Sequence, residues 1–139
     1  MDTNVVELSV RLRPVSQPCV RVLLNDHIRA DLQLTDTLNL DIKFVGSKSA
    51  TLKIEHYNKQ DLDPHTAVVI EEIKFFGISD PKFIWAGVYR PQYPDHYENK
   101  IPERPGQGYL GWNGVYSLEF GVPVFTWIHQ TLDLGWLYD

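Results

Sequence analysis

Apolar and polar residues alternate along much of the first half of the chain. Apolar residues occupy every second position of the segment 6–13, and Pro14 ends that pattern. The same two-residue period returns at 38–44 and 52–57. Successive side chains of a β-strand point to opposite faces, so this period predicts strands with one buried and one exposed face.

The register of the segment 52–57 follows from the same alternation. Leu52, Ile54 and His56 share one face, and Lys53 and Glu55 share the other. We expect the first set to point into the core and the second to point to solvent.

Further strands are predicted by short runs rich in Val, Ile and aromatic residues. They cover the segments 19–24, 28–34, 66–77, 83–89, 115–120 and 124–129. Asn25-Asp26 tolerates positive φ and predicts a tight hairpin between the first two. No window has a convincing capped helical pattern, apart from a single turn near 61–65. Evenly spaced strands predict one all-β domain over 1–139, an antiparallel β-sandwich of jelly-roll type.

The segment 90–111 interrupts this even spacing. It contains four prolines, three glycines and three tyrosines, and therefore predicts a long loop and not a central strand. We expect this loop to pack its tyrosines on the domain or on a second subunit and to form part of a contact surface. Asn113-Gly114, just beyond it, is typical of a type I′ hairpin turn.

Composition narrows the classes of function. The chain has 139 residues, 43% of them hydrophobic, and a net charge of −5. This acidic balance argues against a general nucleic-acid binder, which needs basic residues against phosphates. Cys19 is the only cysteine, so no intrachain disulfide is expected. The start of the chain lacks a signal-peptide pattern and no apolar run is long enough to insert in a membrane.

Most aromatic residues follow position 75, among them all four tryptophans. Rings exposed on a surface stack against sugar rings, and neighbouring polar side chains then bind the hydroxyl groups. The candidate ligand-binding surface consists of Trp85, Tyr89, Arg90, Gln92, Trp112 and Asn113. The alternative is that Trp85, Trp127 and Trp136 are core rings. We favour a core position for Trp127 and an exposed one for Trp112.

Asn58, Asp61 and Asp63 form a second candidate site. Their carboxylate and amide oxygens are ligands that calcium prefers. The alternative is a solvated polar turn, since Asp63-Pro64 is a common turn initiator. We favour the turn, and expect no obligatory cofactor.

Catalytic patterns are absent from the sequence. The five histidines show no paired zinc-ligand spacing. Glu71 and Glu72 are neighbours on a predicted strand, and we expect them to face opposite sides, so they would not flank one glycosidic bond. We therefore predict that the protein is not an enzyme.

The segments LKIEHYNK (52–59) and AVVIEEIKFFG (67–77) resemble paired strands of carbohydrate-binding-module-like jelly rolls, especially the calcium-dependent xylan-binding kind. In that family a strand ends in a loop with Asn or Asp, and a Val/Ile-rich strand returns to a Gly. The resemblance implies a sandwich fold and a glycan ligand. The clustered aspartates of its calcium site are matched in part, by Asn58, Asp61 and Asp63.

A second resemblance, to small virion structural proteins of tailed bacteriophages of marine cyanobacteria, covers most of the chain. It is carried by the segments GVYRPQYP (87–94), LGWNGVY (110–116), PVFTWIH (123–129) and LGWLY (134–138). It implies a non-enzymatic structural or accessory protein of the virion, assembled in the host cytoplasm, that associates with itself or with other virion proteins. The alternative function is a carbohydrate-binding module that recognises host surface polysaccharide.

Overall fold

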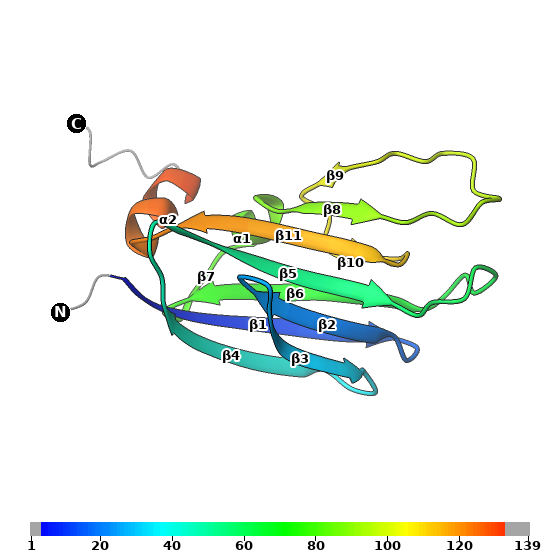
Figure 1. The fold of residues 1–139 in the computed structure, drawn as a ribbon, viewed down its shortest axis with the longest axis horizontal. Coiled ribbons are helices and arrows are strands. Elements are labelled where there is room, and N and C mark those ends of the chain that lie inside the picture. Colours follow the sequence, from blue (N-terminus) through cyan, green and yellow to red (C-terminus); the bar gives the residue numbers. More distant parts are fainter. Residues whose placement is uncertain (1–3, 133–139) are drawn as a thin grey trace.

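Two antiparallel β-sheets pack face to face in the computed structural model, which describes residues 4–132 (Figure 1). The elements are β1 (Val5–Val15), β2 (Cys19–Leu24), β3 (His27–Gln33), β4 (Leu38–Val45), β5 (Ser49–Tyr57), β6 (Ala67–Phe75), β7 (Ile78–Ser79), α1 (Pro81–Trp85), β8 (Val88–Pro91), β9 (Arg104–Pro105), β10 (Tyr109–Leu110), β11 (Gly114–Gly121) and α2 (Val124–Leu132). The first sheet has the order β10-β6-β1-β4, with β7 on β6, and the second has the order β3-β2-β5-β11-β8-β9. The predicted all-β sandwich is confirmed. Trp136 and the segment 134–138 lie outside the described residues.

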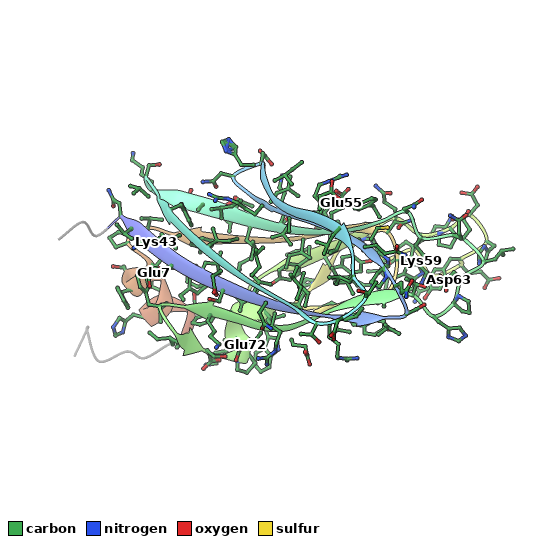
Figure 2. The ribbon with its side chains drawn as sticks, turned by 90° about the horizontal axis from the view of Figure 1, so that it is seen from below. Glu7, Lys43, Glu55, Lys59, Asp63 and Glu72 are labelled. Atoms are coloured by element: carbon green, nitrogen blue, oxygen red, sulfur yellow. The ribbon has the colours of Figure 1, made fainter. Side chains whose placement is uncertain are left out.

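The core lies between the two sheets and is built by the alternating positions. Val6, Leu8, Val10 and Leu12 of β1 are at most 1% exposed. In β5, Leu52, Ile54 and His56 are fully buried, whereas Lys53 and Glu55 point outward and form ion pairs. Figure 2 shows Glu55 on one outer side of the sandwich and Glu72 on the other. The predicted register is confirmed.

The β2–β3 hairpin also follows the prediction. Asn25 and Asp26 have φ values of 49° and 66°, the positive values that a type I′ turn requires at both central positions. The Oδ1 atom of Asn25 accepts a hydrogen bond from the backbone N–H of Thr51 on β5, at 2.9 Å. The hairpin tip is therefore fixed to the neighbouring strand.

Two segments predicted as strands contain helices. Instead of one strand over 83–89, the chain forms α1, whose first turn is capped by the Asp80 carboxylate on Lys82 N–H at 2.9 Å, and then β8. Instead of a strand over 124–129, it forms α2, in which Val124 and Ile128 are buried one turn apart. The period-two assignment was wrong there, because residues i and i+4 share a helix face as well as a strand face.

Aromatic side chains fill the core near the two helices. The Phe75 ring lies edge-on to Phe83, Phe120 and Trp127, with centroid distances of 5.2, 4.9 and 5.3 Å. Trp127 thus packs against the core, as expected, although from a helix. Phe125, two residues earlier on the same helix, is 52% exposed. Neither described helix is long and apolar enough to cross a membrane.

A β-bulge changes the orientation of the paired glutamates on β6. The register shifts between Arg11 and Leu12 of β1, which leaves Glu71 as an extra residue on β6. The Nε atom of Arg11 lies 3.6 Å from Glu71, and its Nη1 atom lies 3.4 Å from Glu72. The expectation that the two carboxylates face opposite sides is therefore wrong. Both are held on the outer face by Arg11, and Arg13 adds a second contact to Glu71 at 3.5 Å.

The dipeptide Asn113-Gly114 is not a hairpin turn. Tyr109 and Leu110 belong to β10 in the first sheet, whereas Gly114 begins β11 in the second sheet. Only Gly114 of the pair has a positive φ, of 150°. The segment 111–113 therefore carries the chain from one sheet to the other. The predicted loop 90–111 likewise contains two short strands, β9 and β10.

Gly87 gives a test of the packing. A Cβ atom at this buried glycine would overlap the ring of Tyr116, whose hydroxyl donates to Ile84 O at 2.7 Å. Tyr116 is fully buried, so its ring cannot swing out to solvent without opening the core.

We expect Gly87→Ala to lower the free energy of unfolding by about 2 kcal/mol in chemical denaturation. The matched control is Gly121→Ala, whose new Cβ has its nearest contact at 3.5 Å; we expect a change of less than about 0.5 kcal/mol. Equal effects of the two variants would contradict this account.

Candidate functional site

A hollow of about 450 Å³ opens at one end of the sandwich. Its walls come from the β5–β6 loop, the β8–β9 loop with Arg104 of β9, the β9–β10 link with Tyr109 of β10, and the β10–β11 link. In Figure 1 these loops lie at the right-hand end, and α2 lies at the opposite end. Figure 2 shows Lys59 and Asp63 of the β5–β6 loop together at this end, far from Glu7 and Lys43 at the other.

One wall of the hollow is an aromatic cluster that also contains an arginine. The rings of Tyr93 and Tyr97 stack at 5.1 Å, with an angle of 5° between their planes. Both lie edge-on to Trp112, at 4.9 and 5.1 Å. The Arg104 guanidinium lies 5.0 Å from the Trp112 ring centre and 5.6 Å from that of Tyr93. We call Tyr93, Tyr97, Arg104 and Trp112 the ring cluster. Its tyrosines pack on the domain, as the sequence predicted for the long loop.

Hydrogen bonds hold the ring cluster in place. The Nε atom of Arg104 donates to the Tyr93 hydroxyl at 2.7 Å, and this hydroxyl donates to Ile101 O at 2.6 Å. Arg104 itself belongs to β9, where it pairs with Tyr89 of β8. The wall is thus anchored to the second sheet through the backbone of Arg104.

Tyr89 lies underneath the cluster and not on the surface. It is fully buried, pairs with Tyr116 on β11, and its hydroxyl donates to Trp112 O and accepts from Trp112 N at 3.0 Å. Burial raises the pKa of this phenol above its ordinary range. The expectation that Tyr89 is part of an exposed binding surface is therefore wrong. Its role in the structure is to hold the backbone that carries the Trp112 ring.

The link between Asn113 and Lys59 forms another wall. The Asn113 side chain accepts from Lys59 N at 2.8 Å and donates to Lys59 O at 3.0 Å. The Nζ atom of Lys59 donates to Gly111 O at 2.5 Å. Burial lowers the pKa of this half-buried amine, and the charge of Asp63 opposes that shift. These contacts join the β5–β6 loop to the crossing between the sheets.

Beneath this wall lies the fully buried His56. Its Nδ1 atom is 2.9 Å from Leu110 O, an arrangement in which Nδ1–H donates to the carbonyl, and Nε2 has no hydrogen-bond partner among the described residues. Desolvation lowers the pKa of the imidazole. The neutral ring therefore belongs to the packing that supports β10.

Asp63 organises the β5–β6 loop. Its Oδ1 atom accepts from the N–H groups of His65 and Thr66, at 2.9 and 3.1 Å, and its Oδ2 atom accepts from the Thr66 hydroxyl. These bonds lower the pKa of Asp63 to about 2, with the Thr66 hydroxyl as the largest cause. This is the turn-forming role that the sequence analysis favoured.

The calcium hypothesis fits this loop poorly. Both oxygens of the Asp63 carboxylate already accept hydrogen bonds from the loop itself. Asn58 and Asp61 are exposed, and Asn58 is not among the residues that line the hollow. Within residues 4–132, no group of three or more His, Cys, Asp or Glu is arranged to hold a metal ion. The three predicted ligands therefore do not form a recognisable calcium centre.

Only half of the six predicted ligand-binding residues line the hollow. Gln92, Trp112 and Asn113 line the hollow, together with Asp61 and Asp63. Trp85, Tyr89 and Arg90 are not among its lining residues.

Trp85 and Arg90 are nevertheless on the surface. Trp85 is 60% exposed at the end of α1, so it is not the core ring of the alternative interpretation. Arg90 is exposed and pairs with Glu103 at 2.8 Å. A variant of either residue can therefore serve as a control: Trp85 for the loss of a ring outside the hollow, and Arg90 for the loss of a charge there.

Sequence reasoning missed Lys59 and Arg104, both of which line the hollow. Tyr97 and Tyr109 also line it; they were expected only as tyrosines of a contact loop and not as members of the candidate residue set. One available signal was the Tyr93–Tyr97 spacing inside a proline-rich loop. Nothing in the local sequence indicated that Lys59 and Arg104, far apart in the chain, would share one site.

Comparison of the sequence with protein-family models and with curated proteins finds no match. Two solved structures have a similar fold. One is described as vCBM60 in complex with galactobiose; its TM-score is 0.55, the identity is 18%, and the alignment covers 84% of this chain and 98% of that one. The other is the selenomethionine form of vCBM60, described with two families of calcium-dependent carbohydrate-binding modules; its TM-score is 0.57, the identity is 18%, and the coverage is 85% and 92%. The fold is thus an all-β sandwich like that of carbohydrate-binding modules, as predicted.

Asp63 provides a pH-dependent test of the loop. A carboxylate whose pKa is depressed on folding stabilises the fold above its unfolded pKa of about 3.9, and this contribution is lost as the pH falls toward 2. We expect Asp63→Asn to lower the free energy of unfolding by about 1 kcal/mol at neutral pH, and the difference from the original protein to vanish near pH 2. The exposed Asp61, which makes no side-chain hydrogen bond within residues 4–132, provides the control Asp61→Asn. A difference that persists unchanged to pH 2 would contradict this role.

Proposed function

We propose that the protein is a non-catalytic carbohydrate-binding module whose ligand, an oligosaccharide, binds in the hollow beside the ring cluster. The observation that carries the proposal is a concave site in which aromatic rings and polar side chains converge. Trp112, Tyr97 and Tyr109 line it, and the Tyr109 side chain is 49% exposed. Sugar rings pack their C–H faces against such rings, while Gln92 and Gln107 offer donors and acceptors to hydroxyl groups.

The rigidity of the wall supports this function. A ligand that binds a mobile loop must order it at a cost in free energy, and pre-organised rings avoid much of that cost. Here Tyr93 and Tyr97 are stacked, Arg104 bridges Tyr93 and Trp112, and Tyr89 fixes the Trp112 backbone. The geometry of the wall is therefore set before a ligand arrives.

The structural neighbours add support at the level of the fold. A sandwich of this kind holds galactobiose in one of them. This makes galactobiose a reasonable first ligand to test, together with oligosaccharides of xylose. Calcium enters the proposal only as a variable of the binding assay, because the candidate ligand residues do not converge on a metal site.

The virion hypothesis has no support of this kind. A hollow with convergent polar groups favours a small ligand, whereas a flat aromatic patch would favour assembly. The shape of the site therefore supports the carbohydrate-binding function over the virion function. Attachment to a polysaccharide is compatible with a module of any origin, and a virion location stays a separate hypothesis.

The test compares ring variants inside and outside the hollow. Tyr97→Ala and Trp112→Ala should weaken oligosaccharide binding by about fivefold or more, since each removes a wall ring worth about 1 kcal/mol or more. Trp85→Ala removes an equally large exposed ring outside the hollow and should leave the affinity unchanged. Isothermal titration calorimetry with galactobiose and xylose oligosaccharides, with and without calcium, measures the effect.

Thermal unfolding of each variant shows whether it is still folded. Tyr97 lies in a loop between strands, so its removal should leave the sandwich folded even if Trp112→Ala does not. If Trp85→Ala abolishes binding while Tyr97→Ala does not, the ligand binds elsewhere. If the original protein binds no oligosaccharide of a broad glycan array, the proposed function is wrong.

A further inference from the structure

The two cations that line the hollow, Lys59 and Arg104, differ from most other basic side chains of the chain in that they form no ion pair within residues 4–132. The chain is acidic, and seven of its thirteen lysine and arginine side chains form ion pairs with carboxylates among the described residues. Of the other six, all but Lys59 and Arg104 are exposed. The paired residues are Arg11, Arg13, Arg21, Lys43, Lys53, Lys74 and Arg90. Lys59 and Arg104, by contrast, form no ion pair within 4.0 Å in the described part of the chain, although both are half-buried. Two unpaired cations in one concave site need an explanation.

Arg104 is fixed in a way that leaves donors free. Its guanidinium is held beside the Tyr93 and Trp112 rings, and its Nε atom is committed to the Tyr93 hydroxyl. A guanidinium has five N–H donors, and those of the two terminal nitrogens have no other hydrogen-bond partner within residues 4–132. A planar, immobilised fork of this kind matches the two oxygens of a carboxylate or sulfate.

Lys59 adds a second positive charge. Its Nζ atom is partly removed from water and contacts only a carbonyl, Gly111 O. An anion nearby would offset the cost of keeping this amine charged.

The carboxylates that line the hollow do not neutralise Lys59 or Arg104. Asp63 is occupied by the Thr66 and His65 donors, and Asp61 is exposed on the loop. Neither lies within ion-pair distance of Lys59 or Arg104. The charge of Asp63 does raise the pKa of Lys59, but the two groups are too far apart to form an ion pair. The two cations thus keep their capacity for an external anion.

We infer that the hollow selects an acidic glycan, with Arg104 binding a carboxylate or sulfate group of the sugar and Lys59 providing a second positive charge beside it. The ring cluster would then contact the sugar ring while the guanidinium edge binds its anionic substituent. This inference rests on the proposed function and narrows its ligand class. It predicts a preference for uronic-acid or sulfated oligosaccharides over neutral ones.

The first test changes only the ligand. Trigalacturonate and its methyl ester have the same sugar rings but differ in charge. We expect the free acid to bind the original protein about tenfold more tightly than the ester, as measured by calorimetry at fixed salt. A second pair, a sulfated galactose oligosaccharide and its desulfated form, distinguishes a sulfate from a carboxylate as the preferred anion. Neither comparison requires a variant to fold.

The second test changes the protein. Arg104→Gln should weaken binding of the acid more than binding of the ester and so remove most of the preference, measured as the ratio of the two affinities; loss of its contacts to Tyr93 and Trp112 lowers both affinities alike. Arg104→Lys, which keeps the charge without the planar fork, should retain part of the preference. Lys59→Met should reduce it to a smaller extent. Arg29→Gln is the matched control, because Arg29 is an exposed arginine of β3 outside the hollow.

The outcomes separate the two claims. If the free acid is not preferred over its ester and the sulfated oligosaccharide is not preferred over its desulfated form, the inference about charge is wrong and the carbohydrate-binding function stands. If the acid is preferred but Arg104→Gln keeps the preference, the anion binds elsewhere and the role of Arg104 is wrong. If neither charged nor neutral oligosaccharides bind, the proposed function itself fails.

Discussion

The hydroxyl of Tyr89 holds the Trp112 backbone on both of its polar groups, and the candidate site depends on this contact. At this point the chain leaves the first sheet and enters the second, so Trp112 has no strand partner of its own. A buried phenol supplies the missing hydrogen bonds, since it can donate to the carbonyl and accept from the N–H at once. The backbone that carries the Trp112 ring is thus held by the core of the second sheet.

In this arrangement, the groups that hold the backbone of the site differ from the side chains that line the hollow. Asn113 fixes the backbone of Lys59, and Tyr89 fixes the backbone of Trp112, while the side chains of Lys59 and Trp112 line the hollow. The buried groups keep the geometry, and the exposed groups supply ring surface and charge. The Lys59 side chain can therefore be changed without a change in the packing of the two sheets.

The strands could be predicted wherever one face of a strand is buried and the other is exposed, because apolar and polar residues then alternate. Val6 to Leu12 shows this period without interruption, and a sandwich follows from several such segments. The prediction failed at α2, because Val124 and Ile128 satisfy a helix face as well as a strand face over so short a window. It failed again at Glu71, because the alternation rule assumes an unbulged strand.

The site was predictable only in part. Trp112 and Asn113 were identified as candidates because ring and amide side chains beside a glycine are typical of an exposed turn. Tyr89 was assigned to the surface because the sequence does not show which face of a short strand is covered. Lys59 and Arg104 are far apart in the sequence and share one site only in the folded chain, so no local sequence pattern predicts that they line the same hollow.

The edges of the two sheets determine where this molecule offers contacts. An open strand edge invites pairing with another chain, and short strands, charges and bulges oppose it. β9 and β10 each contribute an edge of only two residues. β3 is longer, but a shift in its pairing with β2 leaves Arg29 as an extra residue, and Arg29 and Asp31 separate its exposed Ile28 and Leu32 side chains. Strand-to-strand addition is therefore disfavoured at β3, β9 and β10. The remaining edge is β4, which is eight residues long and has the exposed charged residues Asp41 and Lys43.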